Sequence, residues 1–158
     1  MATRTKGGDA ITALILEAFR LNGGLLRAGD RIAGAYGQTS GRWQVLGALR
    51  NGPETVAGIA RAMGLTRQSV QRTADLLAAE GIVEFVENPA HRRAKLVHLT
   101  SAGRETLAGI SALQVTWANG LAAALAADEA EIDAATEVLR QLRRELERQK
   151  ADPKGAKQ

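Results

Sequence analysis

The sequence predicts a mainly α-helical protein that contains one small β-hairpin. Apolar residues recur at three- and four-residue steps through most of the chain, as they do along one face of an α-helix. Residues 82–87 ("IVEFVE") and 94–100 ("AKLVHLT") instead alternate apolar and polar side chains, as in half-buried strands. With 158 residues, of which 45% are hydrophobic, the chain can build the core of one ordinary domain with appended helices.

Composition excludes several classes of function. The chain has no cysteine, which rules out disulfide scaffolds, zinc ribbons, thiol nucleophiles and thiol-based oxidant sensing. A net charge of +4 and a pI near 10.0 suit an anionic partner. There is no apolar run of about eighteen residues and no apolar segment behind the basic start. We therefore expect a soluble, cytoplasmic protein without a membrane partner.

The first predicted helix covers residues 10–38 and follows a flexible polar tail at residues 1–9. Asp9 is expected to cap it. Its apolar positions are Ile11, Leu14, Ile15, Ala18, Leu25 and Ile32. Glycines 23, 24, 29 and 34 should weaken and bend this helix, either as local irregularity or because another helix approaches closely. A second, short helix follows Ser40, with Trp43, Leu46 and Leu49 on one face, and stops at "NGP".

The next segment predicts a tight helix-turn-helix. The stretches "TVAGIARAM" and "TRQSVQRTADLLAAE" are helical, are separated only by Gly64 and Leu65, and end at Gly81. Two helices that meet steeply need a small residue at the crossing, a turn residue that tolerates positive φ, and a buried branched residue on the second helix. Ala60, Gly64 and Val70 supply these, and Ile59 and Leu65 fill the core beside them.

The second of these helices begins with a polar outer face. Thr66 is expected to cap it, and its first two turns carry Arg67, Gln68, Ser69, Gln71 and Arg72. An α-helix fits the major groove of DNA, where arginine bonds guanine, glutamine pairs with adenine, and hydroxyls reach bases or phosphates. A merely solvated helix face is the alternative, but the acidic Asp75 and Glu80 come only later. We therefore expect this face to bind DNA.

The hairpin that follows carries three basic residues beside its predicted Asn-Pro turn. They are Arg92, Arg93 and Lys95. A hairpin next to a reading helix forms a wing, whose tip can straddle a phosphate backbone and insert an arginine into the minor groove. We assign that contact to Arg92 and Arg93, and a phosphate contact to Lys95.

Two helices are predicted at residues 101–150, before a flexible tail at 151–158. Thr100 opens the first, with Asn119-Gly120 as a kink and a stripe of Leu107, Ile110, Gln114, Trp117, Leu121 and Leu125. Asp128 and Glu131 form a capping box for the second. That helix carries an a/d seam of Ile132, Ala135, Leu139, Leu142 and Leu146. The seam can pack on the body of the protein or on a second copy, and we favour a homodimer.

The order of "SGRWQVLGAL", "TVAGIARAMGLTRQSVQRTADLLAAEGIVEF" and "NPAHRRAKLVHLT", between long helices, resembles the MarR family of winged helix-turn-helix regulators over roughly residues 10–150. The resemblance implies a homodimer that binds a pseudo-palindrome, with residues 40–100 as the DNA-binding domain and 10–38 and 101–150 as the dimerisation helices. It also implies that Arg72 contacts DNA and that Asp75 orients a wing arginine. One departure is His91, where many relatives carry an acidic residue.

The resemblance further implies a small effector, frequently an aromatic acid or phenol, that relieves repression from a site between the dimer lobe and the winged domain. Tyr36 and Trp43 flank this junction and are our candidates for lining such a site, although aromatics at helical spacing also serve as core residues.

An enzyme is not expected. The only histidines, His91 and His98, both lie in the hairpin, and the local sequence provides no acid–base pair, metal site or cofactor loop. The better rival is a winged-helix protein-interaction module that acts through the helical seam. Salt separates the two, because binding to several phosphates weakens steeply as salt rises.

Overall fold

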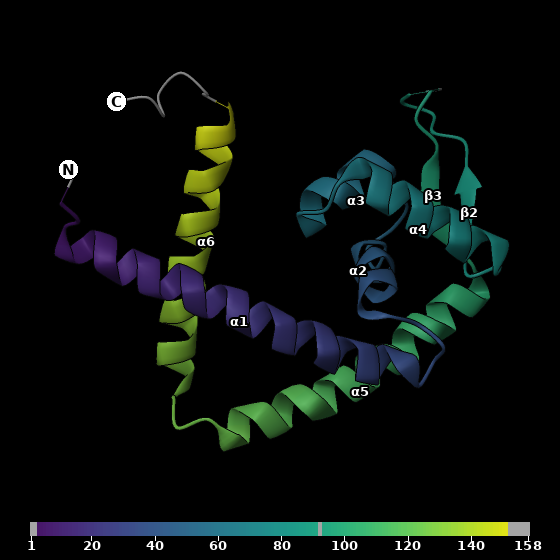
Figure 1. Cartoon of the computed structure of the whole chain (residues 1–158). Coiled ribbons are helices and arrows are strands. Elements are labelled where there is room, and N and C mark those ends of the chain that lie inside the picture. The colour runs from purple at the N-terminus through teal and green to yellow at the C-terminus, as the bar shows by residue number, and fades with distance from the viewer. Residues whose placement is uncertain (1–2, 92, 152–158) are drawn as a thin grey trace. The chain divides into compact units, whose positions relative to one another are not determined.

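The computed structural model describes residues 3–91 and 93–151, so Arg92 and residues 152–158 lie outside the described part. It confirms the predicted class, a mainly helical chain with one small antiparallel sheet (Figure 1). The elements are α1 (Lys6–Gly34), α2 (Ser40–Ala48), β1 (Glu54–Thr55), α3 (Val56–Met63), α4 (Arg67–Ala79), β2 (Val83–Val86), β3 (Leu96–Leu99), α5 (Ser101–Ala124) and α6 (Glu129–Ala151). The chain divides into two compact units, residues 1–115 and 116–158.

Helix α1 begins earlier than the sequence pattern predicts. Thr5 is its N-cap, and the Thr5 hydroxyl accepts a hydrogen bond from the Gly8 amide at 3.0 Å. The prediction that Asp9 caps this helix is therefore wrong, as is the boundary that placed Lys6 to Asp9 in a tail. Asp9 lies in the first turn, where a carboxylate faces the positive end of the helix dipole.

Of the four glycines expected to weaken α1, at positions 23, 24, 29 and 34, one marks the close approach of another helix. Gly29 is buried, and a methyl group there would lie only 2.7 Å from the Ser40 hydroxyl of α2. The neighbouring Asp30 carboxylate accepts a hydrogen bond from the Ser40 amide at 2.7 Å. Around Gly24 and Gly34 the space is open. α1 runs unbroken through all four glycines, and Gly29 fits it onto the start of α2.

The core of the first unit lies among α2, α3, α4, the sheet and the start of α5. Its buried residues are Val45, Leu46, Leu49, Ile59, Ala60, Val70, Ala74, Leu77, Val83, Val97, Leu99 and Leu107. The predicted contributions of Ile59, Ala60 and Val70 are confirmed, and Gly64 adopts the positive φ of 66° that the turn requires. This shared core fixes α4 relative to the hairpin (Figure 1).

The sheet has one strand more than the sequence predicts. Its order is β1-β3-β2, with β3 antiparallel to both neighbours; Phe85 pairs with Val97, and Val97 with Glu54. β1 contains only two residues, too few to show an alternating pattern, so the sequence predicts only the hairpin. Because β1 leads directly into α3, the third strand ties the helix-turn-helix to the wing.

An ion pair and a glycine turn hold the C-terminal end of α4. The Arg42 guanidinium of α2 donates to both carboxylate oxygens of Glu80, at 2.7 and 2.8 Å. Gly81 follows with a φ of 72°, so the prediction that it ends this helix is confirmed. The paired, planar geometry of such a contact fixes direction as well as distance.

Helix α5 meets the hairpin at Gly103, which is buried. The Thr100 hydroxyl caps α5 by accepting from the Gly103 amide at 3.1 Å and donates to the Gly81 carbonyl at 2.7 Å. A methyl group on Gly103 would collide with the backbone carbonyl oxygen of Ile82. The backbone of Gly103 lies directly against the backbone of Ile82, so neither segment can move easily to make room for a side chain.

We expect Gly103→Ala to lower the free energy of unfolding by about 2 kcal/mol, because the added methyl overpacks this contact. Gly120→Ala, in the same helix, meets open space and should be neutral or stabilising by up to about 1 kcal/mol. Urea unfolding of both variants measures the difference. Equal stability of the two variants would contradict the close packing at Gly103.

The remaining helices follow the predicted pattern, with one difference. α5 continues through Asn119 and Gly120 as one helix. The kink expected at these two residues does not interrupt it. The Asp128–Glu131 capping box is confirmed by reciprocal hydrogen bonds of 2.9 and 3.0 Å. On α6, hydrogen bonds from Arg144 and Gln141 lower the pKa of the exposed Glu137 carboxyl.

Within the described residues, no single helix is long and apolar enough to cross a membrane, and α5 and α6 reach that length and composition only when taken together.

Candidate nucleic-acid interface

The N-terminus of α4 has the predicted cap. The Thr66 hydroxyl accepts a hydrogen bond from the Ser69 amide at 3.1 Å, and the Thr66 backbone is extended. The residues assigned to DNA contact on this helix are all exposed, and they are Thr66, Arg67, Gln68, Ser69, Gln71 and Arg72. The helix is therefore anchored on one side and free on the other.

The direction of each α4 side chain follows from the helix itself. Val70, Ala74 and Leu77 are buried and define the inner face. With about 100° between successive residues, Gln68 and Arg72 lie almost opposite that face and project straight outward. Arg67 and Gln71 lie to one side of this outer line, and Ser69 lies to the other.

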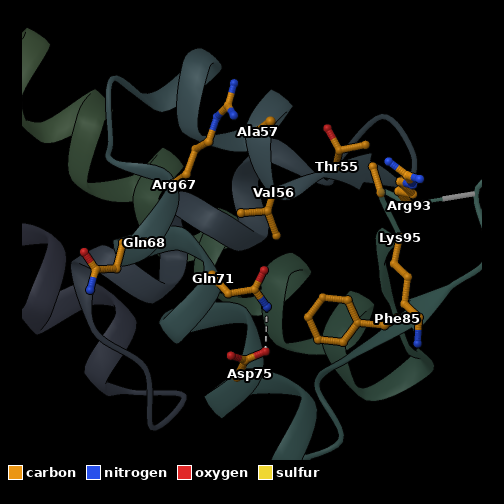
Figure 2. Close-up of a pocket in the computed structure, with 11 residues that line it drawn as sticks. Thr55, Val56, Ala57, Arg67, Gln68, Gln71, Asp75, Phe85, Arg93 and Lys95 are labelled. Carbon is orange, nitrogen blue, oxygen red and sulfur yellow. Dashed lines mark hydrogen bonds between the residues drawn. The ribbon is translucent and has the colours of Figure 1, made fainter. Parts of the chain in front are cut away.

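The side with Arg67 and Gln71 faces the wing across a hollow of about 720 Å³ (Figure 2). We call this the α4–wing hollow. Its lining residues come from the start of α3, from α4, from β2 and from the wing loop, and they are Thr55, Val56, Ala57, Arg67, Gln68, Gln71, Asp75, Phe85, Arg93, Ala94 and Lys95. The structure thus brings together four of the predicted α4 residues, counting Asp75, and two of the predicted wing residues.

The wing loop, residues 87–95, is longer than predicted, because β2 ends at Val86 and β3 begins only at Leu96, inside the predicted strands 82–87 and 94–100. The Asn88 side-chain oxygen accepts from the Ala90 amide at 3.0 Å, and the His91 carbonyl accepts from the Ala94 amide at 2.9 Å. Arg93 and Lys95 are exposed. Arg92, also assigned to DNA contact, lies outside the described residues.

Asp75 has a partner that the sequence did not suggest. Its carboxylate oxygen Oδ1 accepts a hydrogen bond from Gln71 Nε2 at 2.8 Å, one helical turn earlier (Figure 2). The expected role of Asp75, to orient a wing arginine, stays a prediction, because Arg92 is not described. Asp75 and Arg93 nevertheless line the same hollow.

Sequence reasoning missed the apolar wall of the hollow. Val56 and Ala57 come from the first turn of α3, and Phe85 comes from the middle of β2. Each is only half-buried, and none stands out in the sequence as a site residue. These residues could not be assigned to the hollow because the sequence does not predict β1, the strand that brings the start of α3 to the wing.

The chain is similar in sequence to known proteins. Residues 36–94 match the model of the MarR family. Over 134 residues the chain is 38% identical to an uncharacterized protein of Mycobacterium tuberculosis (strain ATCC 25618 / H37Rv), which covers 85% of this chain and 92% of that protein. The chain belongs to the MarR family.

Solved structures of MarR-family proteins share the fold. Staphylococcus aureus MarR, solved with salicylate and kanamycin, gives a TM-score of 0.76 at 14% identity, over 90% of this chain and 96% of that one. The M. tuberculosis transcriptional regulator MosR, solved with DNA, gives 0.69 at 21% identity, over 84% and 96%. Membership therefore places this chain among transcriptional regulators with the winged-helix DNA-binding fold.

The two candidate effector residues of this MarR-family chain have different surroundings. Trp43 is half-buried and packs against the core of the first unit, so it serves as a core residue. Tyr36 is 43% exposed, and its ring covers Gly109 of α5, where a methyl group would collide with it. Among the described residues, no group of three or more His, Asp or Glu side chains is arranged to hold a metal ion.

Proposed function

We propose that this MarR-family protein is a sequence-specific regulator that binds double-stranded DNA as a homodimer on a pseudo-palindromic operator. The observation that carries the proposal is the α4–wing hollow, which has exposed donor side chains of α4 on one wall and Arg93 and Lys95 on the other. A duplex that enters from the open side meets both walls together. The groove edges and the phosphates between them suit these two sets of donors.

Helix α4 is proposed to lie in the major groove with Gln68 and Arg72 pointing at base edges. Arginine can bond O6 and N7 of guanine with two parallel hydrogen bonds, and glutamine can bond adenine. Thr66 and Ser69 lie at the positive end of the helix, where their hydroxyls suit a phosphate. Arg67 lies on the hollow side, between the two groups of contacts.

The wing is proposed to contact the backbone and the adjacent minor groove. Arg93 and Lys95 are exposed, and their side chains are long enough to reach phosphates that flank the major-groove site. Arg92 is proposed for the same region because the sequence places it next to Arg93 at the wing tip. Such contacts add affinity for any sequence and orient α4.

The homodimer is proposed to use the α6 seam. Ile132, Leu139 and Leu146 are 38%, 43% and 55% exposed in the single chain, although they share one apolar stripe. Apolar stripes on a terminal helix are usually buried against another helix, and a second copy supplies one of the same kind. α1 adds further exposed apolar residues, among them Phe19 at 73%.

We expect Leu139→Glu to convert the dimer to monomer and to weaken operator binding by at least about 10-fold, because a buried charge in a seam costs several kcal/mol. Ala134→Glu places the same charge on the opposite, exposed face of α6 and should leave the dimer intact. Sedimentation velocity measures the assembly state. A dimeric Leu139→Glu protein would exclude the seam as the interface.

The direction of regulation is proposed to be repression that a small aromatic effector relieves. S. aureus MarR has been solved with salicylate, which supports an aromatic acid as the class of ligand. Tyr36 is the better of the two candidate contacts, since its ring lies between the end of α1 and α5 and stays partly exposed. Trp43 is proposed only to support that region from the core.

Selection of bound sequences from random duplex DNA tests the proposed function. We expect a symmetric consensus whose half-site centres are about 34–36 Å apart, one helical turn. Binding to that consensus should weaken with salt, with a log–log slope of about −0.9 for each phosphate neutralised. A protein-interaction module that uses the seam would select no consensus and would respond little to salt.

A further inference from the structure

We propose that Asp75 is a positioning residue that fixes the polarity of the Gln71 amide. Held in this way, Gln71 presents its carbonyl oxygen to the major groove and selects a base that carries an exocyclic amino group, adenine or cytosine. This inference rests on the proposed function. It gives Asp75 a role in specificity that is separate from any contact with a wing arginine.

The polarity follows from the chemistry of the pair. Asp75 Oδ1 and Gln71 Nε2 are 2.8 Å apart, and both residues are exposed on the same side of α4. An ionised carboxylate only accepts hydrogen bonds, so the NH₂ end of the amide must face it. A reversed amide would set two acceptor oxygens against each other. Figure 2 shows the Gln71 nitrogen toward Asp75 and the oxygen on the side of Val56.

The surroundings make this restraint necessary. The charged groups that share the hollow with Gln71 are Arg67, one turn earlier, and Arg93 and Lys95 of the wing loop, besides Asp75 itself. All three cations are hydrogen-bond donors, and none of them can accept from the Gln71 nitrogen. Among these groups Asp75 alone sets which end of the amide faces along α4.

The fixed polarity restricts what Gln71 can recognise. A carbonyl oxygen cannot donate to a phosphate, so its partner on the DNA must be a hydrogen-bond donor. In the major groove those donors are the amino groups of adenine N6 and cytosine N4, whereas guanine and thymine offer acceptors at the corresponding positions. Gln71 is therefore a base reader, in contrast to the cations around it.

The test compares base preference across wild type and four variants. Duplexes are built on the consensus that wild-type protein selects from random DNA, with each of the four base pairs placed in turn at every half-site position. Dissociation constants are measured for wild type, Gln71→Ala, Asp75→Ala and Asp75→Asn. Glu105→Gln serves as the control, because it removes one carboxylate from the exposed surface of α5, away from α4 and the wing loop, and leaves the Gln71–Asp75 pair intact.

In wild type we expect one position per half-site to prefer adenine or cytosine by about 5- to 10-fold. Gln71→Ala should abolish the preference and so identify the position. Asp75→Ala should reduce it to less than about 2-fold at that same position, without weaker binding overall. Asp75→Asn, whose side chain both donates and accepts, should show a preference between those of wild type and Asp75→Ala, and Glu105→Gln should match wild type.

Three results would overturn the inference. In the first, Asp75→Ala keeps the wild-type preference at the Gln71 position. In the second, Asp75→Ala weakens binding equally on every duplex, which is the result expected if Asp75 only holds a wing arginine. The position could also prefer guanine or thymine. If wild-type protein selects no consensus at all, the proposed function fails and this inference fails with it. If wild-type protein selects a consensus and Asp75→Ala keeps the same base preference, only this inference is refuted. Circular dichroism confirms that each variant is folded.

Discussion

Replacing Arg72 by alanine is expected to weaken operator binding about 10- to 100-fold, since a bidentate contact between arginine and guanine contributes about 1–3 kcal/mol. Arg72 projects from the face of α4 opposite the buried Val70 and Ala74. Its loss should also relax the base preference at one position of each half-site. Fluorescence anisotropy at one fixed salt concentration measures both effects.

Arg143→Ala is the matched control for Arg72→Ala. Arg143 is an exposed arginine of α6 that pairs with Glu147 at 3.3 Å, so its loss removes the same charge from another part of the chain. Exposed pairs of this kind contribute little to stability, and both variants should unfold as wild type does. Equal binding by the two variants would show that α4 does not read DNA through Arg72.

The second large effect is expected from the double variant Arg92→Ala, Arg93→Ala. Affinity should fall about 10-fold or more on all sequences alike, because contacts with phosphates and with the minor groove carry little base information. The salt dependence should become shallower by about 0.9 for each phosphate contact that is lost. Titrations of consensus and random duplex at several salt concentrations measure both quantities.

Arg20→Ala with Arg143→Ala removes two cations from α1 and α6 and controls for net charge in the wing experiment. This pair of changes should leave the preference between consensus and random DNA as it is and lower affinity only slightly. A wing variant that loses binding to the consensus alone would reassign these arginines to base reading. A wing variant with unaltered affinity would remove the wing from the interface.

The local parts of the fold could be predicted from the sequence because their signals are local. Ala60, Gly64 and Val70 specify the crossing of α3 and α4 within eleven residues, and Asp128 with Glu131 specify the start of α6. The helix-turn-helix, the hairpin and the exposed face of α4 follow from such patterns. Each is confirmed by the structure with small shifts of boundary.

The tertiary details could not be predicted, because they depend on residues distant in sequence or on a choice between equivalent groups. Thr5 and Asp9 are both good caps, and geometry selects Thr5. β1 forms only because β3 is already in place to pair with it, and its two residues carry no pattern of their own. The i,i+4 spacing of Gln71 and Asp75 permits their hydrogen bond, but the same carboxylate could equally bond a wing arginine, and spacing alone does not select between the two.

The central claim is that α4 and the wing face one duplex from the same side. Footprinting on the selected consensus tests it most directly, with guanine-N7 methylation for the major groove and hydroxyl radicals for the minor groove. We expect major-groove protection at each half-site centre, flanked by minor-groove protection on the same face of the DNA, of which the Arg92→Ala, Arg93→Ala variant loses only the latter. Protection of one groove alone, or of opposite faces of the duplex, would contradict the account.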